Sequence, residues 1–511
     1  MTLHLSIVLW LPLIAGVLAL LAGPGARWLA LAGTVATLVY AIALIVDFDS
    51  SAVGLQYVTD QVWISELGIH YKLGVNGLNL FLIALTAVLW VATTIWAGRE
   101  NYARPGLFFF WLGLGETAVL GALMAQDLAL FVVFFDLMLV PFFFLTGGWG
   151  TGENRIAAVI KLVIYTLVGS LLMLTAAIAT GVLAPGEGIT FVLSDLTLES
   201  HRLPEGSQDW IFLCFAAAFL VKMPAFPLHG WMPDGYRAMP LPVLAVFSGV
   251  LSKVAAYGFL RIALPLFPDA AARYQELLLL IALASILYGS VVAFTTTNTR
   301  LVLGYSSVAQ LGFILLGIFS LRPEGAQGAV LQAVNHGLVV APAFFIVALL
   351  AMRAGGSEDL RDMGGLAVRA PVLATMFLIV ALANLAMPGS SNFVGEFFIL
   401  LGVFNAKIVI CIVAFTGVAL ASVYTLRLFI RAMHNREGPQ VMSREMTVGD
   451  GLVLVPLVAC ILAFALYPQL ALHKDQRSVV ESVLPAAAIA QPGQPLDAAV
   501  EAARREARAR R

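Results

Sequence analysis

Long apolar segments recur along the whole chain, and they restrict its fold more than any other feature. A helix that crosses the hydrocarbon core of a bilayer needs about 20 apolar residues, and the sequence contains about fourteen such segments. Backbone amides find no water within a bilayer, so these segments are expected to be helical. We predict an all-α polytopic membrane protein with about 14 transmembrane helices. The segments lie near residues 4–22, 28–46, 77–97, 107–124, 128–148, 156–182, 210–228, 241–263, 275–294, 300–320, 326–352, 371–405, 407–430 and 451–470.

The composition agrees with this class and argues against several others. Hydrophobic residues make up 60% of the 511 positions and charged residues 12%, far from the soluble range. A net charge of -1 gives no reason to expect nucleic acid as a partner. The cysteines Cys214, Cys411 and Cys460 stand far apart, and the sequence has no CxxC motif and no phosphate-binding loop. We therefore expect no cofactor or metal in this chain.

Basic residues predict the orientation, because short cytoplasmic loops carry an excess of Lys and Arg. The loops following the first, third, fifth and seventh segments carry Arg27, Arg99, Arg155 and Arg237, and the same alternation continues to Arg427 and beyond. These loops are predicted to be cytoplasmic, which places both termini outside. The basic tail EAARREARARR disagrees, but late charges weigh less than early ones. Residues 4–22 lack a preceding basic region and are predicted as a first helix, not a cleaved signal.

Several ionisable residues lie deep inside the predicted spans, where each charge costs about 2.5–3.5 kcal/mol. Glu116 and Asp136 each lie about ten residues, roughly 15 Å, from the turn between their spans, so antiparallel neighbours would hold them at one level. Lys222 and Lys253 come about twelve residues into their spans. His336 and Glu396 lie within the eleventh and twelfth spans, and Lys161 is one or two turns inside the sixth.

Each of these residues also has a purely structural interpretation. A buried Lys–Asp pair can hold two helices together, and a single buried histidine is usually a hydrogen-bonded interior residue. A row of groups of both signs at one depth favours transport instead. Burial disfavours the charged form of a lysine and a neighbouring carboxylate restores it, so such a row can pass a proton at little cost.

Two spans are interrupted next to these charges. Pro224 and Pro227 follow Lys222 directly, and Pro388 and Gly389 precede Glu396 in a segment too long for one straight crossing. Broken helices at membrane depth are tolerated where they are buried in protein or line a wet cavity. Their corresponding positions in the two halves indicate internal repeats and predict the ion path.

At these residues the chain resembles the antiporter-like membrane subunits of respiratory complex I, most closely those of the M type. The resemblance covers about residues 107 to 430 and keeps the family order. A glutamate at position 396 favours the M type, because the related L and N types usually have lysine there. The matching stretches are DLALFVVFFDLMLVPFFFLTGGWG, NRIAAVIKLVIYTLVGSLLML, KMPAFPLHGWMPD, SKVAAYGFLRI, LVLGYSSVAQLGF, AVNHGL and AMPGSSNFVGEFFIL.

The resemblance implies fourteen helices, with two inverted five-helix repeats and broken helices 7 and 12. It divides the chain into helices 1–3 (residues 1–106), a first repeat (107–263), a second repeat (275–430), helix 14 (451–470) and a C-terminal tail (471–511). The tail is predicted as an amphipathic or disordered surface segment.

The resemblance also implies the roles of individual residues. Asp136 would pair with a lysine, Lys222 would be the first half-channel's proton carrier, and Lys253 would link it to the membrane centre. His336 would be a relay in the second half and Glu396 the exit-side carrier. Glu116, Lys161 and His229 complete the expected proton path.

The implied function is that of a non-redox subunit of a proton-translocating NADH:quinone oxidoreductase in the bacterial plasma membrane. NADH, FMN, iron–sulfur clusters and quinone would be bound by partner subunits. The expected partners are L-type and N-type antiporter-like neighbours and the lipid bilayer.

The chain departs from the family pattern at three places. Asp136 replaces the usual glutamate, so its contact with lysine is expected to be bridged by water. Gln310 replaces a histidine and cannot titrate. Tyr236 and Ala238 replace a histidine and a glutamate in the loop after His229.

Three alternatives remain at this point. A subunit of a multisubunit cation/proton antiporter or of a membrane-bound hydrogenase would share the repeats. A structural anchor for a redox arm would tolerate neutral Lys222 or Glu396. A quinone-binding enzyme fits less well, because the sequence has no cofactor motif.

Overall fold

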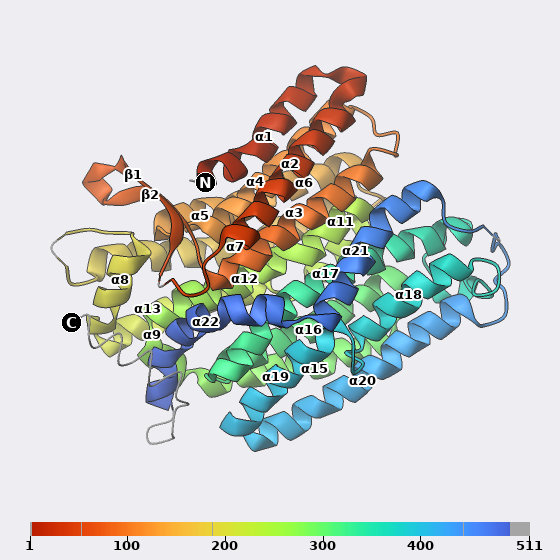
Figure 1. Ribbon diagram of the computed structural model, residues 1–511. Helices are drawn as coiled ribbons and strands as arrows, with labels where there is room; N and C mark the ends of the chain where they lie inside the picture. The colour runs from red at the N-terminus through yellow and green to blue at the C-terminus, as the bar shows by residue number, and fades with distance from the viewer. Residues whose placement is uncertain (1–2, 53, 187, 443, 491–511) are drawn as a thin grey trace.

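The computed structural model describes residues 3–52, 54–186, 188–442 and 444–490, which form a tilted bundle of helices (Figure 1). Eleven helical spans in these ranges are long and apolar enough to cross a membrane. They are α2 (Ala26–Asp47, with η1, Gly23–Gly25, before it), α3 (Gly77–Ala97), α4 (Pro105–Met124), α5 (Leu128–Leu137) with α6 (Leu139–Trp149), α7 (Arg155–Leu183), the run α11 to α13 (Leu241–Leu266), α15 (Gln275–Thr295), α16 (Thr299–Phe319), α17 (Pro323–Arg353), α20 (Ile408–Met433) and α21 (Val448–Leu466).

Other helices are shorter or more polar, which explains why eleven spans are counted here and about fourteen were predicted. The helix α9 carries Glu205, Asp209 and Lys222 within its 18 residues. The remaining elements are α1 (Leu5–Leu21), α8 (Leu193–Glu199), η3 (Ser200–Arg202), α9 (Glu205–Lys222), α10 (Met232–Ala238), α14 (Pro268–Arg273), η6 (Leu360–Asp362), α18 (Pro371–Asn384), α19 (Ser391–Ala406) and α22 (Gln469–Ala490).

Two predicted spans are less regular than expected. The segment 128–148 was predicted as one helix but is divided at Met138, because Pro141 has no N–H to donate to the carbonyl four residues earlier. The segment 241–263 contains two π-helical turns, η4 (Phe247–Leu251) and η5 (Phe259–Ala263), which divide it into α11 (Leu241–Val246), α12 (Ser252–Gly258) and α13 (Leu264–Leu266).

A β-hairpin between α2 and α3 was not predicted. It pairs β1 (Gln56–Ile64) with β2 (Ile69–Val75) antiparallel, joined through η2 (Ser65–Leu67), and projects from one end of the bundle (Figure 1). Asp60 lies opposite Lys72 in the register, and their side chains form an ion pair of 2.9 Å. The charged pair favours this register.

The connecting segments contact one another in two separate groups. In one group, Lys474 Nζ donates to Phe48 O at 2.9 Å, and the Gln126 amide donates to Lys72 O at 2.9 Å. In the other group, Arg27 donates to Gly98 O at 3.3 Å. Each group contains the loops that the charge pattern assigned to the same side of the membrane. Further pairs are Arg273–Asp209 and Lys407–Glu276 in the first group, and Thr151–Ala238, Arg300–Met239 and Arg99–Asp450 in the second.

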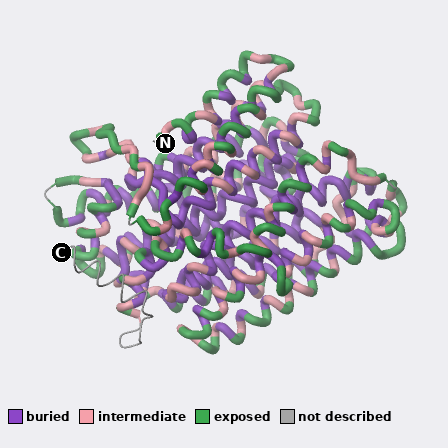
Figure 2. Tube along the Cα trace, viewed as in Figure 1, coloured by how far each residue is buried: buried purple, intermediate pink, exposed green. Residues whose placement is uncertain are grey.

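The centre of the bundle is formed by α16, α17 and the run α11 to α13, which are buried nearly throughout (Figure 2). Outer helices instead expose large apolar side chains, for example Val46 on α2 and Phe415 on α20. Such surfaces are expected where helices face lipid.

The helix α22 lies across the bundle (Figure 1) and packs on α3, α14 and α17. Gln327 Nε2 of α17 donates to Leu472 O and to Asp475 Oδ1, both at 2.8 Å. The Gly77 amide of α3 donates to Ser478 Oγ at 3.0 Å. The predicted surface segment is therefore an amphipathic helix up to Ala490, and the basic tail EAARREARARR lies outside the described residues.

Candidate functional site

Lys222 is the last residue of α9 and is 6% exposed. Its Nζ donates to the main-chain carbonyl of Phe135 and lies 3.7 Å from the centre of the Phe135 ring. That carbonyl belongs to the last turn of α5, where carbonyls lack partners within the helix. The non-helical segment after Lys222 contains Pro224 and Pro227, and Trp231 Nε1 donates back to Val221 O at 3.0 Å. The end of α9 thus supplies the ammonium group of this contact, and the end of α5 supplies the carbonyl.

The carboxylates of Asp136 and Glu116 have no close cationic partner. Asp136 directly follows Phe135, yet it forms no ion pair with Lys222 among the described residues; its buried Oδ1 has no hydrogen-bond partner there, while the carboxyl group is hydrogen-bonded to Ser170. Glu116 on α4 is completely buried, and neither of its oxygens is hydrogen-bonded to a described residue. A direct Asp136–lysine ion pair is therefore not observed among the described residues.

Lys253 lies between the two π-helical turns and is completely buried. Its Nζ donates to the carbonyl of Ser248 in η4 at 2.6 Å. A π turn disturbs the regular hydrogen bonding of a helix, and such turns are frequent at functional sites. His336 on α17 is also completely buried, and neither ring nitrogen bonds to a described residue. A Cβ on the neighbouring Gly337 would lie 2.6 Å from Gly249 O, so α17 approaches η4 closely.

Glu396 is the sixth residue of α19 and is 3% exposed. Gln310 Nε2 of α16 donates to Glu396 Oε1 at 2.8 Å. Gln332 Nε2 of α17 donates to Gln310 Oε1 at 2.8 Å and to Glu396 Oε1 at 3.4 Å. Both glutamines are completely buried. The residue that replaces the family histidine is thus a direct partner of the proposed exit carrier.

The interruption between α18 and α19 is surrounded by further polar side chains. Asn384, the last residue of α18, donates to Ser306 Oγ at 3.2 Å and to Thr425 Oγ1 at 3.0 Å. Asn335, next to His336, donates to Ser391 O at 2.6 Å. Asn392 is completely buried, and its side-chain amide has no partner among the described residues. Buried groups of this kind are usually satisfied by ordered water.

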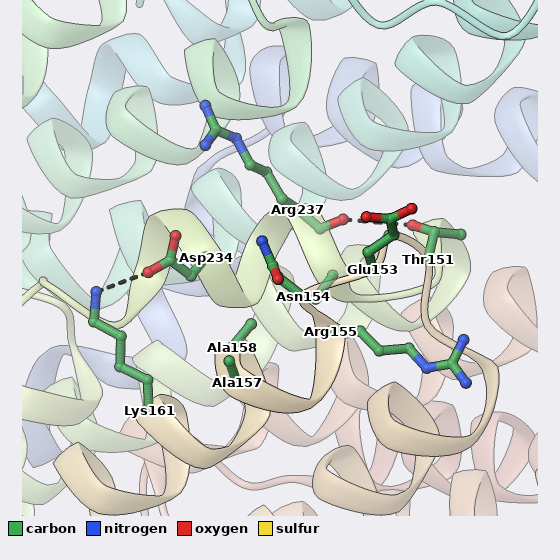
Figure 3. Close-up of a pocket in the computed structure, with 11 residues that line it drawn as sticks. Thr151, Glu153, Asn154, Arg155, Ala157, Ala158, Lys161, Asp234 and Arg237 are labelled. Atoms are coloured by element: carbon green, nitrogen blue, oxygen red, sulfur yellow. Dashed lines mark hydrogen bonds and ion pairs between the residues drawn. The ribbon is translucent and has the colours of Figure 1, made fainter.

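Lys161 lies at a surface pocket of about 470 Å³ and not in the interior row (Figure 3). Its Nζ forms an ion pair of 2.7 Å with Asp234 Oδ2, and both side chains are half-exposed. The pocket lies between the start of α7 and α10, while Arg237 extends away from the ion pair (Figure 3). His229 lies in the segment before α10, and its ring packs 4.9 Å from that of Tyr288.

The structure therefore places the predicted residues in four groups. They are Lys222 on Phe135 with Asp136 next to it in sequence, Lys253 with the nearby His336, the Glu396 cluster and the Lys161 pocket, while Glu116 is buried apart from them and His229 packs on Tyr288. Sequence reasoning missed Gln332 and Asp234. A polar residue four positions before His336 in an otherwise apolar segment was the available signal for Gln332. In the described residues, no group of three or more His, Cys, Asp or Glu side chains could hold a metal ion.

A multi-pass helical bundle with buried ionisable groups beside helix interruptions defines an antiporter-like membrane subunit. Residues 125–421 match the family model described as NADH:quinone oxidoreductase/Mrp antiporter, transmembrane. NADH-quinone oxidoreductase subunit M of Rhodobacter capsulatus is 36% identical over 484 residues, which are 91% of this chain and 93% of that protein.

Solved structures agree with this comparison. A chain of respiratory complex I from Thermus thermophilus matches with a TM-score of 0.86 and 30% identity, covering 95% of this chain and all of that one. A chain of the Mrp complex from Dietzia has the same fold, with a TM-score of 0.81 at 22% identity, covering 98% of this chain and 100% of that one. The protein belongs to the subunit M family of NADH-quinone oxidoreductases.

Proposed function

We propose that this chain moves protons across the bacterial plasma membrane as the M-type, non-redox subunit of a NADH:quinone oxidoreductase. The observation that carries the proposal is the position of Lys222 and Glu396, each buried beside an interrupted helix. Charges are costly at this depth unless they serve transport. Non-helical backbone beside them supplies polar groups and space for water.

The proposed path has two half-channels. Protons enter near Lys161 and His229 and reach Lys222, whose charged form the Asp136 carboxylate stabilises through water. Glu116 adds a second acid to this half. Lys253 and His336 connect the halves at the centre of the membrane, and Glu396 releases the proton towards the opposite side.

A pair of matching contacts supports two inverted repeats of five helices, residues 107–263 and 275–430. The second helix of each repeat starts with a side-chain cap: the Leu130 amide donates to Asp127 Oδ1 and the Leu301 amide donates to Asn298 Oδ1, both at 3.0 Å. Each cap residue forms an isolated antiparallel bridge to the segment after the third helix, Asp127 with Val192 and Asn298 with Asp359.

The flanking main-chain bonds match as well. The Leu128 amide donates to Phe191 O at 2.7 Å, and the Thr299 amide donates to Glu358 O at 2.8 Å. The two contacts belong to the two different groups of connecting segments, as an inverted repeat requires. Arg361 hydrogen-bonds Asp359 and lowers the pKa of that carboxyl to about 2, so this contact keeps its charge at neutral pH.

Counting α9 with α10 and α18 with α19 as single interrupted crossings, helices 7 and 12, gives fourteen crossings. An even number places both termini on one side, and the loop charges assign that side to the outside. In this arrangement residues 1–106 hold helices 1–3, residues 451–470 hold helix 14, and the segment from 471 lies on the outer surface.

The chemistry of NADH oxidation belongs to partner subunits in this proposal. They would carry NADH, FMN, iron–sulfur clusters and quinone, while L-type and N-type neighbours flank this chain in the membrane. A cation/proton antiporter subunit is the second candidate, since the Mrp chain shares the fold. The higher identity to subunits M favours the first, and neighbouring genes for flavin and iron–sulfur subunits would support it.

Replacing the two carriers tests the proposal. Lys222→Ala and Glu396→Gln should each abolish NADH-driven acidification of membrane vesicles while the complex still assembles. NADH oxidation by the assembled complex is measured in parallel to match complex content. Undiminished acidification in both variants would instead leave the chain as a structural anchor.

A further inference from the structure

The carboxylate of Glu396 is held asymmetrically. Its Oε1 accepts from Gln310 Nε2 at 2.8 Å and from Gln332 Nε2 at 3.4 Å. Its Oε2 is buried and has no hydrogen-bond partner among the described residues. The two glutamines come from different helices, α16 and α17, so three helices meet at this one carboxyl group.

The two amides support each other's orientation. Gln332 Nε2 also donates to Gln310 Oε1 at 2.8 Å, which leaves Gln310 Nε2 to face Glu396. Turning one amide alone would bring two donors or two acceptors together, and turning both would place Gln310 Oε1 against the ionised carboxylate. A carboxylate accepts hydrogen bonds only, and the observed orientation therefore suits both the ionised group and the carbonyl oxygen of the neutral acid.

We propose that Gln332 is a positioning residue that, together with Gln310, commits Glu396 Oε1 to accepting, so that the transported proton is held at Oε2. The inference rests on the proposed function, in which Glu396 carries the proton. Side-chain amide groups do not titrate near neutral pH, so Gln310 and Gln332 orient the carboxyl group of Glu396 without competing for its proton. Protonation and release then occur at one defined oxygen. Oε2 is the oxygen free to meet a water or a protonated neighbour.

Infrared difference spectroscopy on the assembled complex tests where the proton lies. The carbonyl band of neutral Glu396 is identified by its loss in Glu396→Gln. In Gln332→Met and in Gln310→Leu this band should move to higher frequency, because the carbonyl oxygen loses a hydrogen bond. NADH-driven proton uptake should fall about tenfold in Gln332→Met, the size expected for one hydrogen bond to a carboxyl group.

Gln275→Leu is the matched control. Gln275 is a buried glutamine that donates to the carbonyls of Phe319 and Ser320 at 3.0 and 3.2 Å, away from Glu396. In Gln275→Leu, the position of the Glu396 band and the rate of proton uptake should equal those of the unmodified complex. If the Glu396 band stays in place in both Gln332→Met and Gln310→Leu, the proton is held at Oε1 and the assignment is wrong.

The two proposals fail differently. Normal proton uptake in Glu396→Gln contradicts the proposed function itself, whatever the position of the band. Lost uptake in Glu396→Gln with an unmoved band in Gln332→Met contradicts only the positioning role.

Discussion

The ammonium group of Lys222 is bound to Phe135, through its main-chain carbonyl and the face of its ring, and not to the neighbouring Asp136. Asp136 is thus the sequence neighbour of the residue that binds Lys222, but its carboxylate forms no ion pair with the ammonium group among the described residues. A carboxylate without a direct cationic partner acts on the lysine through the electric field and bridging water, and both depend on its charge.

Asp136→Asn should therefore reduce proton uptake strongly, on the order of tenfold, because the charged form of Lys222 loses its stabilising carboxylate. Asp136→Glu should be mild or neutral, since it keeps the charge and the longer side chain reaches further. NADH-driven acidification in vesicles of matched complex content measures both. Normal pumping in Asp136→Asn would mean that the carboxylate is structural or that Glu116 replaces it.

The second half can be tested at Gln310 and His336. His336→Ala should reduce uptake strongly, because His336 is the titratable group on this route between Lys253 and Glu396. Gln310→His should be tolerated, as it keeps a donor to Glu396, whereas Gln310→Leu removes that donor and should slow transfer. Proton uptake is compared among the three variants. A silent His336→Ala would place the path elsewhere and leave the Lys222 half unaffected.

The ion pair at the pocket allows stability to be separated from transport. Half-exposed pairs such as Lys161–Asp234 contribute about 0–1 kcal/mol, so Lys161→Ala should hardly change thermal stability. If protons enter at this pocket, uptake should nevertheless slow several-fold. Lys407→Ala is the control, because it removes a comparable pair with Glu276 from the other group of loops. Equal uptake rates in both variants would remove the pocket from the path.

The docking of α22 depends on a glycine. A Cβ at position 77 would lie 2.4 Å from Lys474 O and 2.6 Å from Asp475 Cα, both main-chain atoms that cannot move alone. Gly77→Ala should destabilise this contact by about 1–3 kcal/mol. Thermal inactivation of the complex and protease access to residues 469–490 measure the effect. Gly147→Ala, with nothing within 4 Å of its new methyl group, should be neutral or slightly stabilising.

Sequence reasoning located the helices well because the bilayer imposes one simple requirement, a long apolar segment, on each of them. It also predicted interruptions at Pro224, Pro227 and Pro388, since proline removes a helical hydrogen bond locally, and these prolines lie between α9 and α10 and between α18 and α19. Pro141 carried the same signal, but its segment was short enough for one crossing and was read as continuous. The hairpin at residues 56–75 was not predicted, because the length of an apolar segment indicates a span but carries no information on strand alternation.

The sequence did not predict which groups the individual side chains contact. Lys222 binds the carbonyl of Phe135 at the end of α5, close to where the backbone is divided at Met138. Hydropathy does not encode such a local position of the backbone. Gln332 contacts Gln310 and Glu396 only because α16, α17 and α19 meet at one level. Such a meeting is a property of the tertiary packing and not of any one segment.

The helix α22 is hydrogen-bonded to three separate parts of the bundle. It bonds to Gly77 of α3, to Gln327 of α17, and through Ser482, which donates to Leu260 O, to the run α11 to α13. A sliding motion of α17 against α3 or against the run α11 to α13 would have to break at least one of these bonds or move α22 with it. The rate of amide hydrogen exchange along residues 469–490, compared between turnover and rest, would therefore report whether the helices that α22 connects move against one another.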